Sequence, residues 1–381
     1  MAKANLNFFN WIQKEIPYSK YYIIILHLTH RAFHSIINTE WLDLSYNLLY
    51  RVHLSKLRHL TFLNITHNRF NEIPSFKDES GHFLPIQHIN LAYNPFTTIS
   101  TDTFPPTLQH LDLSCLRMRS FPSEALNTAA QLKRLIIKGC SGHETSRLAV
   151  IERGAFSNSQ LEVLDLRGNQ IFSIPDKLPI SIRHLNLGFN QLTNLQETCV
   201  DPDHLYNRAA TAGSHHEAGS KLKSLINLKT IDFTHNRMTH ICIDDLINLN
   251  DLERLNISYN KIDSIPINAF SFAPNLQTLD LTSNKMQIFN MENMAALKWL
   301  SVAKNAIYTL VDPRTYPNLV EFDSSYNPYK CDCHLKKFVE FMKNPRAITV
   351  VGQNSKEYHQ RYQVKYLKNC ISISQVINSI D

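Results

Sequence analysis

Histidines and cysteines are the side chains in this chain whose types and spacing suggest chemistry. The 381 residues include seven cysteines and 18 histidines. His204, His215, His216 and Glu217 gather in one polar stretch and have the residue types of metal ligands. No second Cys or His cluster supplies a closed site, so we expect a solvated histidine pair and no metal or cofactor.

No catalytic constellation accompanies them. The chain has no phosphate-cradling glycine loop, no nucleophile elbow and no HExxH motif, and it holds only nine glycines in all. We therefore predict a protein that is not an enzyme. Lys and Arg outnumber Asp and Glu by 39 to 33, but the formal charge of +6 is spread without a basic run. This charge gives no specific nucleic-acid signal.

Cys199 and Cys242 flank a polar segment at about residues 197–222 that contains these histidines. The segment is poor in apolar residues and has the Gly, Ala and Ser content of an exposed loop. A disulfide between the two cysteines would pin the base of that loop. Two ordinary core thiols are the alternative, because spacing alone does not show connectivity.

A repeated motif must position all of these residues. In Leu161–Ile171 the sequence is LEVLDLRGNQI, with the pattern L-x-x-L-x-L-x-x-N-x-L. Its alternation predicts a strand with one buried face. The asparagine can donate and accept, so it can satisfy backbone groups in a buried turn. The same frame recurs about twelve times, at Asn47, Asn68, Asn94, Leu116, Cys140, Asn169, Asn190, Asn236, Asn260, Asn284, Asn305 and Asn327.

This period predicts an α/β leucine-rich-repeat solenoid. No unit can bury its own apolar edge, so neighbours must stack, with a parallel sheet on the concave face and short helices or turns on the convex face. We assign the solenoid to 36–330, interrupted by the insert at 197–222. Residues 1–35 are a poorly defined flank whose longest apolar run, Tyr21–Leu26, is far shorter than a membrane span.

The concave face can be predicted from the strand positions. The strand position between the two inner leucines repeatedly holds Asp or Asn, which is common in such repeats and favours a structural role. The exposed position on the other side of the first of these leucines holds large aromatic and imidazole groups, which are better contact candidates on an exposed sheet. These candidates are Trp41, Phe62, His88, His110, His184 and Trp299. A surface of this extent, roughly 55 Å for twelve strands, suits a protein or another macromolecule.

The pattern changes after Asn327, where the sequence is NPYKCDCHLKKFVEFMKNP. Asn327, Pro328, Cys331 and Cys333 resemble the start of the C-terminal cysteine-rich cap of extracellular leucine-rich-repeat proteins. We assign this cap to 331–370 and a tail to 371–381. In that family the second cysteine of the pair bonds to the last, so the resemblance implies a disulfide from Cys333 to Cys370. The family cap has four cysteines and this one has three.

The irregular repeats, the insert and the cap ending LKNCISIS are most similar to Toll-like receptor ectodomains. That resemblance implies a recognition module at the cell surface or outside the cell, with a macromolecular ligand and a second receptor chain as a possible dimer partner. The family's transmembrane and signalling segments are absent from this sequence. The alternative is a secreted matrix or adhesion protein of the small proteoglycan type, which the segment IPDKLP resembles. An intracellular scaffold does not fit the cap.

Two concave positions carry acceptor sequons for N-linked sugar. They are Asn64-Ile65-Thr66 and Asn256-Ile257-Ser258. In a secreted protein, a glycan at Asn64 or Asn256 would crowd the concave face and favour binding at a lateral surface. Asn90 and Asn186 occupy the same slot without a sequon, so chance is the alternative explanation.

Overall fold

The structure is a computed structural model, and it describes residues 37–140, 147–157, 159–196, 199, 220–310, 315–329 and 349–350. The contacts divide the chain into two compact units. The first unit comprises the residues up to Ile171 together with Pro175–Ile182. The second comprises Phe172–Ile174 and the residues from Arg183 onward.

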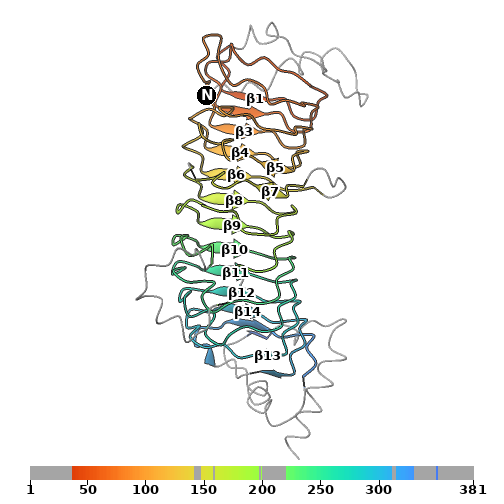
Figure 1. The fold of residues 1–381 in the computed structure, drawn as a ribbon, viewed down its shortest axis with the longest axis vertical. Helices are drawn as coiled ribbons and strands as arrows, with labels where there is room; N and C mark the ends of the chain where they lie inside the picture. The colour runs from red at the N-terminus through yellow and green to blue at the C-terminus, as the bar shows by residue number, and fades with distance from the viewer. Residues whose placement is uncertain are drawn as a thin grey trace, which may run out of the picture. The chain divides into compact units, whose positions relative to one another are not determined.

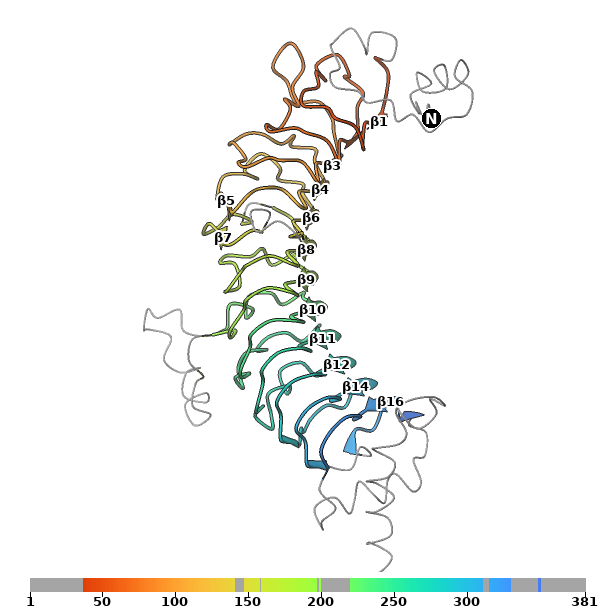
Figure 2. The same cartoon turned by 90° about the vertical axis from the view of Figure 1, so that its right-hand side faces the viewer.

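The first unit is built around a ladder of short parallel strands, drawn in red to yellow-green in Figure 1. Their order follows the sequence: β1, β2, β3, β4, β6 and β8. The strands are β1 (Trp41–Asp43), β2 (Phe62–Asn64), β3 (His88–Asn90), β4 (His110–Asp112), β6 (Arg134–Ile136) and β8 (Val163–Asp165). A second, two-stranded parallel sheet pairs β5 (Ser120–Phe121) with β7 (Val150–Ile151), on the side away from β4 and β6 (Figure 2).

The second unit repeats this plan. Its long sheet has the order β9, β10, β11, β12, β14, β16 and β17 among the described residues. These strands are β9 (His184–Asn186), β10 (Thr230–Asp232), β11 (Arg254–Asn256), β12 (Thr278–Asp280), β14 (Trp299–Ser301), β16 (Glu321–Asp323) and β17 (Thr349–Val350). The short pair is β13 (Ile288–Phe289) with β15 (Thr309–Leu310).

Strand alternation sets which side chains are buried. The central residue of each strand points inward, as Leu42, Leu63 and Leu111 do with at most 1% exposure. The first and third residues point to the opposite face, which we call the sheet face. Neighbouring strands align without offset, so that Leu42 pairs with Leu63. Each strand position therefore forms a straight row across the repeats.

The repeated asparagine forms an internal hydrogen-bond ladder, as its dual donor and acceptor capacity predicts. The Nδ2 atom of Asn68 donates to Leu44 O at 2.9 Å in the preceding repeat and to Ile65 O at 3.1 Å in its own. Its Oδ1 atom accepts from Leu49 N at 2.9 Å. Asn94 makes the equivalent bonds one repeat later. Each asparagine thus joins two repeats through groups that would otherwise be buried unpaired.

The side away from the long sheets is formed by turns packed on phenylalanine. Within the described ranges it contains hydrogen-bonded turns and no α-helix. Of the short helices or turns predicted for the convex face, the structure therefore has turns. Phe121 and Phe156 are fully buried there, with ring centroids 5.3 Å apart. The predicted insert and cap lie outside the described residues, except for Cys199, the segment 220–222 and β17.

Candidate ligand-recognition surface

The first strand position in the first unit carries four consecutive ring side chains. Strand register places Trp41, Phe62, His88 and His110 side by side in one row. The Trp41 and Phe62 rings stack with centroids 3.4 Å apart and an interplanar angle of 5°. Phe62 lies 6.1 Å from His88. Trp41 is 45% exposed, so the row presents aromatic surface to solvent at its first strand.

The two histidines at the other end of the row are bonded to each other. Their Nδ1 atoms lie 2.6 Å apart, so one ring donates and the other accepts, which requires at least one neutral imidazole. Burial lowers the pKa of both His88 and His110. The charges of His88, Arg134 and Lys133 lower the pKa of His110 further. The pair therefore favours its uncharged, hydrogen-bonded form at neutral pH.

The other two sequence candidates, His184 and Trp299, lie in the second unit and do not touch each other. Between them the same row holds Thr230, Arg254 and Thr278. The exposed His184 shares a hydrogen bond of 2.8 Å with Thr230 Oγ1. A continuous row of rings therefore forms in the first unit and not in the described part of the second.

The third strand position has the structural role that its Asp and Asn content predicts. The Oδ1 atom of Asp112 accepts the backbone N–H of Ser114 at 2.9 Å, two residues further along. The same short-range bond recurs at Asp232 and Asp280. It fixes the turn that follows each of these three strands. One carboxylate or amide oxygen of each residue is thus used internally, and the other atoms stay at the sheet face.

The two sequon asparagines occupy this third position and are half-buried. Asn64 Nδ2 donates to Asp43 Oδ2 at 3.1 Å, and its Oδ1 accepts from Thr66 N at 3.1 Å. Asn256 Oδ1 accepts from both N and Oγ of Ser258. A sugar attached to Asn64 would replace one of the two hydrogens of Nδ2, the atom that now donates to Asp43 Oδ2.

A further row of rings was missed by the sequence reasoning. The residue just before the ladder asparagine adopts a left-handed backbone in repeat after repeat, with φ near +55°. We call these residues the turn row, and two stacks of rings form in it. Tyr46, His67 and Tyr93 make one stack, and Phe189, His235 and Tyr259 make the other, with neighbouring centroids 4.0–4.2 Å apart. The recurring words SYN, THN and AYN are the signal that could have identified it.

A second missed feature interrupts the ladder. Cys115 and Cys140 form a disulfide across adjacent repeats. Cys115 belongs to the turn row, and Cys140 occupies an asparagine slot. The signal was their separation of 25 residues, close to one repeat period, which brings two thiols near each other in a solenoid.

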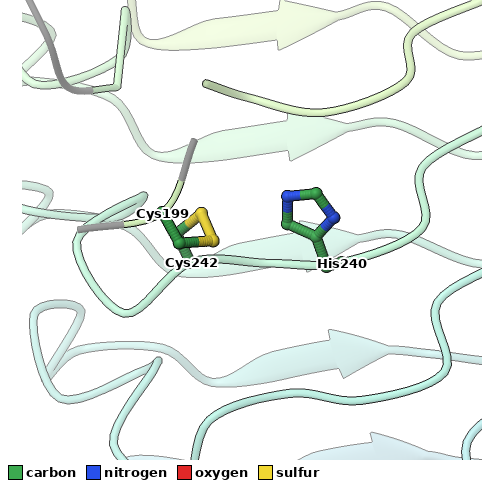
Figure 3. A group of neighbouring side chains, drawn as sticks. All are labelled: Cys199, His240 and Cys242. Carbon is green, nitrogen blue, oxygen red and sulfur yellow. A yellow bond between two sulfur atoms is a disulfide. The ribbon is translucent and has the colours of Figure 1, made fainter. Parts of the chain in front are cut away.

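Cys199 and Cys242 also form a disulfide, so they are not two separate core thiols. His240 lies beside them, and Figure 3 shows its ring on the same stretch of chain as Cys242. A metal binds cysteine as a thiolate, and here both sulfurs are bonded to each other. His204, His215, His216, Glu217, Cys333 and Cys370 lie outside the described residues.

Comparison with known proteins supports the repeat assignment. The family model described as Leucine rich repeat matches residues 250–307, and a second model described as Leucine Rich Repeat matches residues 160–179. TLR13 in the crystal structure of its complex with ssRNA13 gives a TM-score of 0.58 at 19% identity, over 86% of this chain and 52% of that one. At this identity the match shows the fold alone.

Sequence relatives match this chain to different extents. Rat (Rattus norvegicus) lumican is 25% identical over 277 residues, which is 71% of this chain and 64% of lumican. Human Toll-like receptor 5 is 27% identical over 115 residues, which is 30% of this chain and 13% of the receptor. No helix among the described residues is long and apolar enough to cross a membrane. The parallel ladder and these matches together identify the chain as a leucine-rich-repeat protein.

Proposed function

We propose that this chain is an extracellular recognition module of the small leucine-rich proteoglycan type, which binds a protein partner on the sheet face of its first unit. The single observation that carries the proposal is the row of Trp41, Phe62, His88 and His110, which follow one another on adjacent strands. Exposed aromatic groups in a rigid array are the side chains that dominate protein interfaces.

Rigidity supports this use of the row. Each ring is anchored by a strand whose central residue is buried, and Leu42, Leu63 and Leu111 are at most 1% exposed. Trp41 is further fixed by stacking on Phe62. Binding of a partner to the row therefore buries aromatic area, and the ring side chains of this protein lose little conformational entropy.

The proteoglycan type is favoured over the Toll-like type by the extent of the matches. Lumican aligns with 71% of this chain, whereas Toll-like receptor 5 aligns with 30%. The two disulfides in the described residues fit an oxidising compartment outside the cell. Recognition of a matrix protein is then the proposed activity, and we assign no catalytic role.

Collagen binding tests this proposal, because fibrillar collagen is the main structural protein of the matrix. Purified chain is incubated with immobilised type I collagen, with immobilised albumin as the control surface. We expect saturable binding to collagen and none to albumin. Absence of saturable collagen binding would count against the matrix assignment.

A Toll-like receptor ectodomain is the second candidate, and the irregular repeats, the insert and the cap ending LKNCISIS favour it. In that case the longer transcript encodes a span of about 20 apolar residues soon after Cys370. The ligand is then a macromolecule, and a second receptor chain is the partner. Sequencing the transcript distinguishes the two candidates, since a stop codon after Asp381 in every isoform favours the matrix protein.

Glycosylation at Asn64 or Asn256 bears directly on the binding face. Asn64 lies on β2, next to Asp43 of β1, so a glycan there would stand beside Trp41 and Phe62. Recognition through the row thus requires Asn64 to be free of sugar in the secreted protein. Intact-mass analysis before and after glycosidase treatment, repeated on Asn64→Gln, measures its occupancy.

A further inference from the structure

A pocket of about 410 Å³ opens where the first ring stack of the turn row ends. The stack runs from Tyr46 through His67 to Tyr93. In the next two repeats the residue at this place is Cys115 and Gly139, which carry little or no side chain, and of these two Cys115 has the left-handed backbone. The pocket forms because the large Tyr93 side chain is followed by these small residues. The Cys115–Cys140 disulfide forms part of the pocket wall.

Tyr93 is one of the residues that line this pocket. One face of its ring is covered by His67, with centroids 4.0 Å apart and an interplanar angle of 13°. Among the described residues no ring covers the opposite face, and Tyr93 is 48% exposed. Aromatic faces carry partial negative charge and attract the slightly positive hydrogens of C–H groups.

The strand side of the pocket offers one hydrogen-bond donor and one acceptor next to each other. Asn90 and Asp112 are register partners on β3 and β4, and both line the pocket. Each uses its Oδ1 atom to accept a backbone N–H, from Ala92 and from Ser114. In the described part of the chain, Asn90 Nδ2 and Asp112 Oδ2 have no hydrogen-bond partner.

The pocket lining carries one acidic and one basic side chain, Asp112 and Lys138. Asp112 contributes one negative charge, and Lys138 contributes one positive charge that is already 3.3 Å from Asp165 Oδ2. A strongly anionic ligand would face the Asp112 carboxylate. A lysine or arginine side chain has donors only, so it would satisfy Asp112 and leave the Asn90 donor unpaired. The lining therefore favours a neutral ligand that both donates and accepts.

We propose that this pocket binds a neutral saccharide. A pyranose ring has one flat face of C–H hydrogens, which suits the free face of Tyr93. Neighbouring hydroxyls at its edge can accept from Asn90 Nδ2 and donate to Asp112 Oδ2, because each hydroxyl does both. The volume falls in the range of ligand pockets and holds roughly one or two pyranose units. This site shares strands β3 and β4 with the row of Trp41 to His110 but none of the row's four residues, and its test does not depend on collagen binding.

Binding to immobilised neutral oligosaccharides of hexoses and N-acetylhexosamines tests the site. The protein is first treated with a glycosidase that removes N-linked sugar, so that a glycan at Asn64 does not compete. We expect at least one oligosaccharide to bind, and titration with that free oligosaccharide gives the dissociation constant. Tyr93→Asn, which keeps a residue tolerant of the left-handed turn, and Asp112→Asn should each weaken binding about tenfold or more, as loss of a strong contact predicts.

Two matched variants control for folding. Phe189→Asn removes an exposed turn-row ring in the second unit, and Asp323→Asn neutralises a third-position carboxylate there. Both should bind the oligosaccharide as the parent does, and circular dichroism should show all four variants folded. No binding up to about 10 mM, well above ordinary millimolar affinities, would overturn the proposal. So would unchanged affinity in Tyr93→Asn and Asp112→Asn.

Discussion

Cys115 and Cys140 are bonded across the two consecutive repeats in which the ladder asparagine is missing. Leu116 and Cys140 stand in those two slots, so neither repeat can make the hydrogen bonds that Asn94 and Asn169 make on either side. A covalent link between the repeats thus coincides with the gap in the ladder. We infer that the disulfide replaces the missing connection.

Removing this disulfide should destabilise the protein. The bond joins residues separated by 25 positions, so Cys115→Ala with Cys140→Ala should lower the free energy of unfolding by about 3 kcal/mol. Introducing Cys140→Asn in the Cys115→Ala background should recover about 1 kcal/mol, because the asparagine can bond as Asn169 does. Urea unfolding followed by circular dichroism measures both changes. Equal stability of the parent and the double alanine variant would refute the role assigned to the bond.

Gly139 is predicted to tolerate no side chain. A Cβ atom built there would lie 2.1 Å from the backbone oxygen of Gly168 in the next repeat. Gly139→Ala should therefore cost about 3 kcal/mol or more, since the backbone must move apart. Gly81 is the matched control: its φ is +82°, but no atom lies within 4 Å of an added Cβ. Gly81→Ala should cost about 1–2 kcal/mol. Thermal unfolding of the two variants tests this order, and the reverse order would contradict it.

Asp245 should make stability depend on pH. Burial raises the pKa of this carboxyl to about 7, from 3.8 in a model compound, and the charge of Asp244 adds to the rise. Between these two pH values the unfolded chain ionises Asp245 while the folded chain keeps it protonated, so the folded state binds more protons. The contribution to stability is fully present below pH 3.8 and is lost as the pH rises through about 7.

Asp245→Asn tests that dependence. Asparagine keeps an oxygen to accept the Cys242 N–H, which lies 2.7 Å from Asp245 Oδ2. The variant should lose less stability than the parent between pH 4 and pH 8, by an amount on the order of 4 kcal/mol at most. Urea unfolding across this range measures the difference, with the exposed Asp251→Asn as the control. Parallel pH profiles for the parent and Asp245→Asn would rule out Asp245 as the source.

Much of the architecture could be predicted because every repeat carries the same sequence pattern. The spacing of leucines and asparagines is a local pattern, and it placed the strands, the ladder and the row that begins at Trp41. The aromatic turn row escaped prediction because a left-handed turn has no hydrophobic periodicity of its own. The Cys115–Cys140 bond needed the alignment of neighbouring repeats, in which residues far apart along the chain become lateral neighbours.

The row that begins at Trp41 shows what the strand pattern predicts and what it leaves open. A common strand position predicts a common face, and Trp41, Phe62, His88 and His110 do share one. It does not predict that rings follow one another without interruption. In the second unit, Thr230, Arg254 and Thr278 separate His184 from Trp299. Whether the rings form a continuous row therefore depends on the residues between the candidates. Because the row is continuous only among the described strands of the first unit, we place the candidate binding surface there.

The affinity of ring-deleted variants for collagen tests the central claim most directly. Trp41→Ala removes the exposed ring that caps the row, and a buried interface anchor of this kind is worth about 2 kcal/mol or more. Surface plasmon resonance on immobilised type I collagen should show a dissociation constant about 30-fold higher for Trp41→Ala than for the parent. Tyr326→Ala, which removes an exposed ring in the second unit, should bind as the parent does. Equal affinity of Trp41→Ala and the parent would contradict recognition through this row.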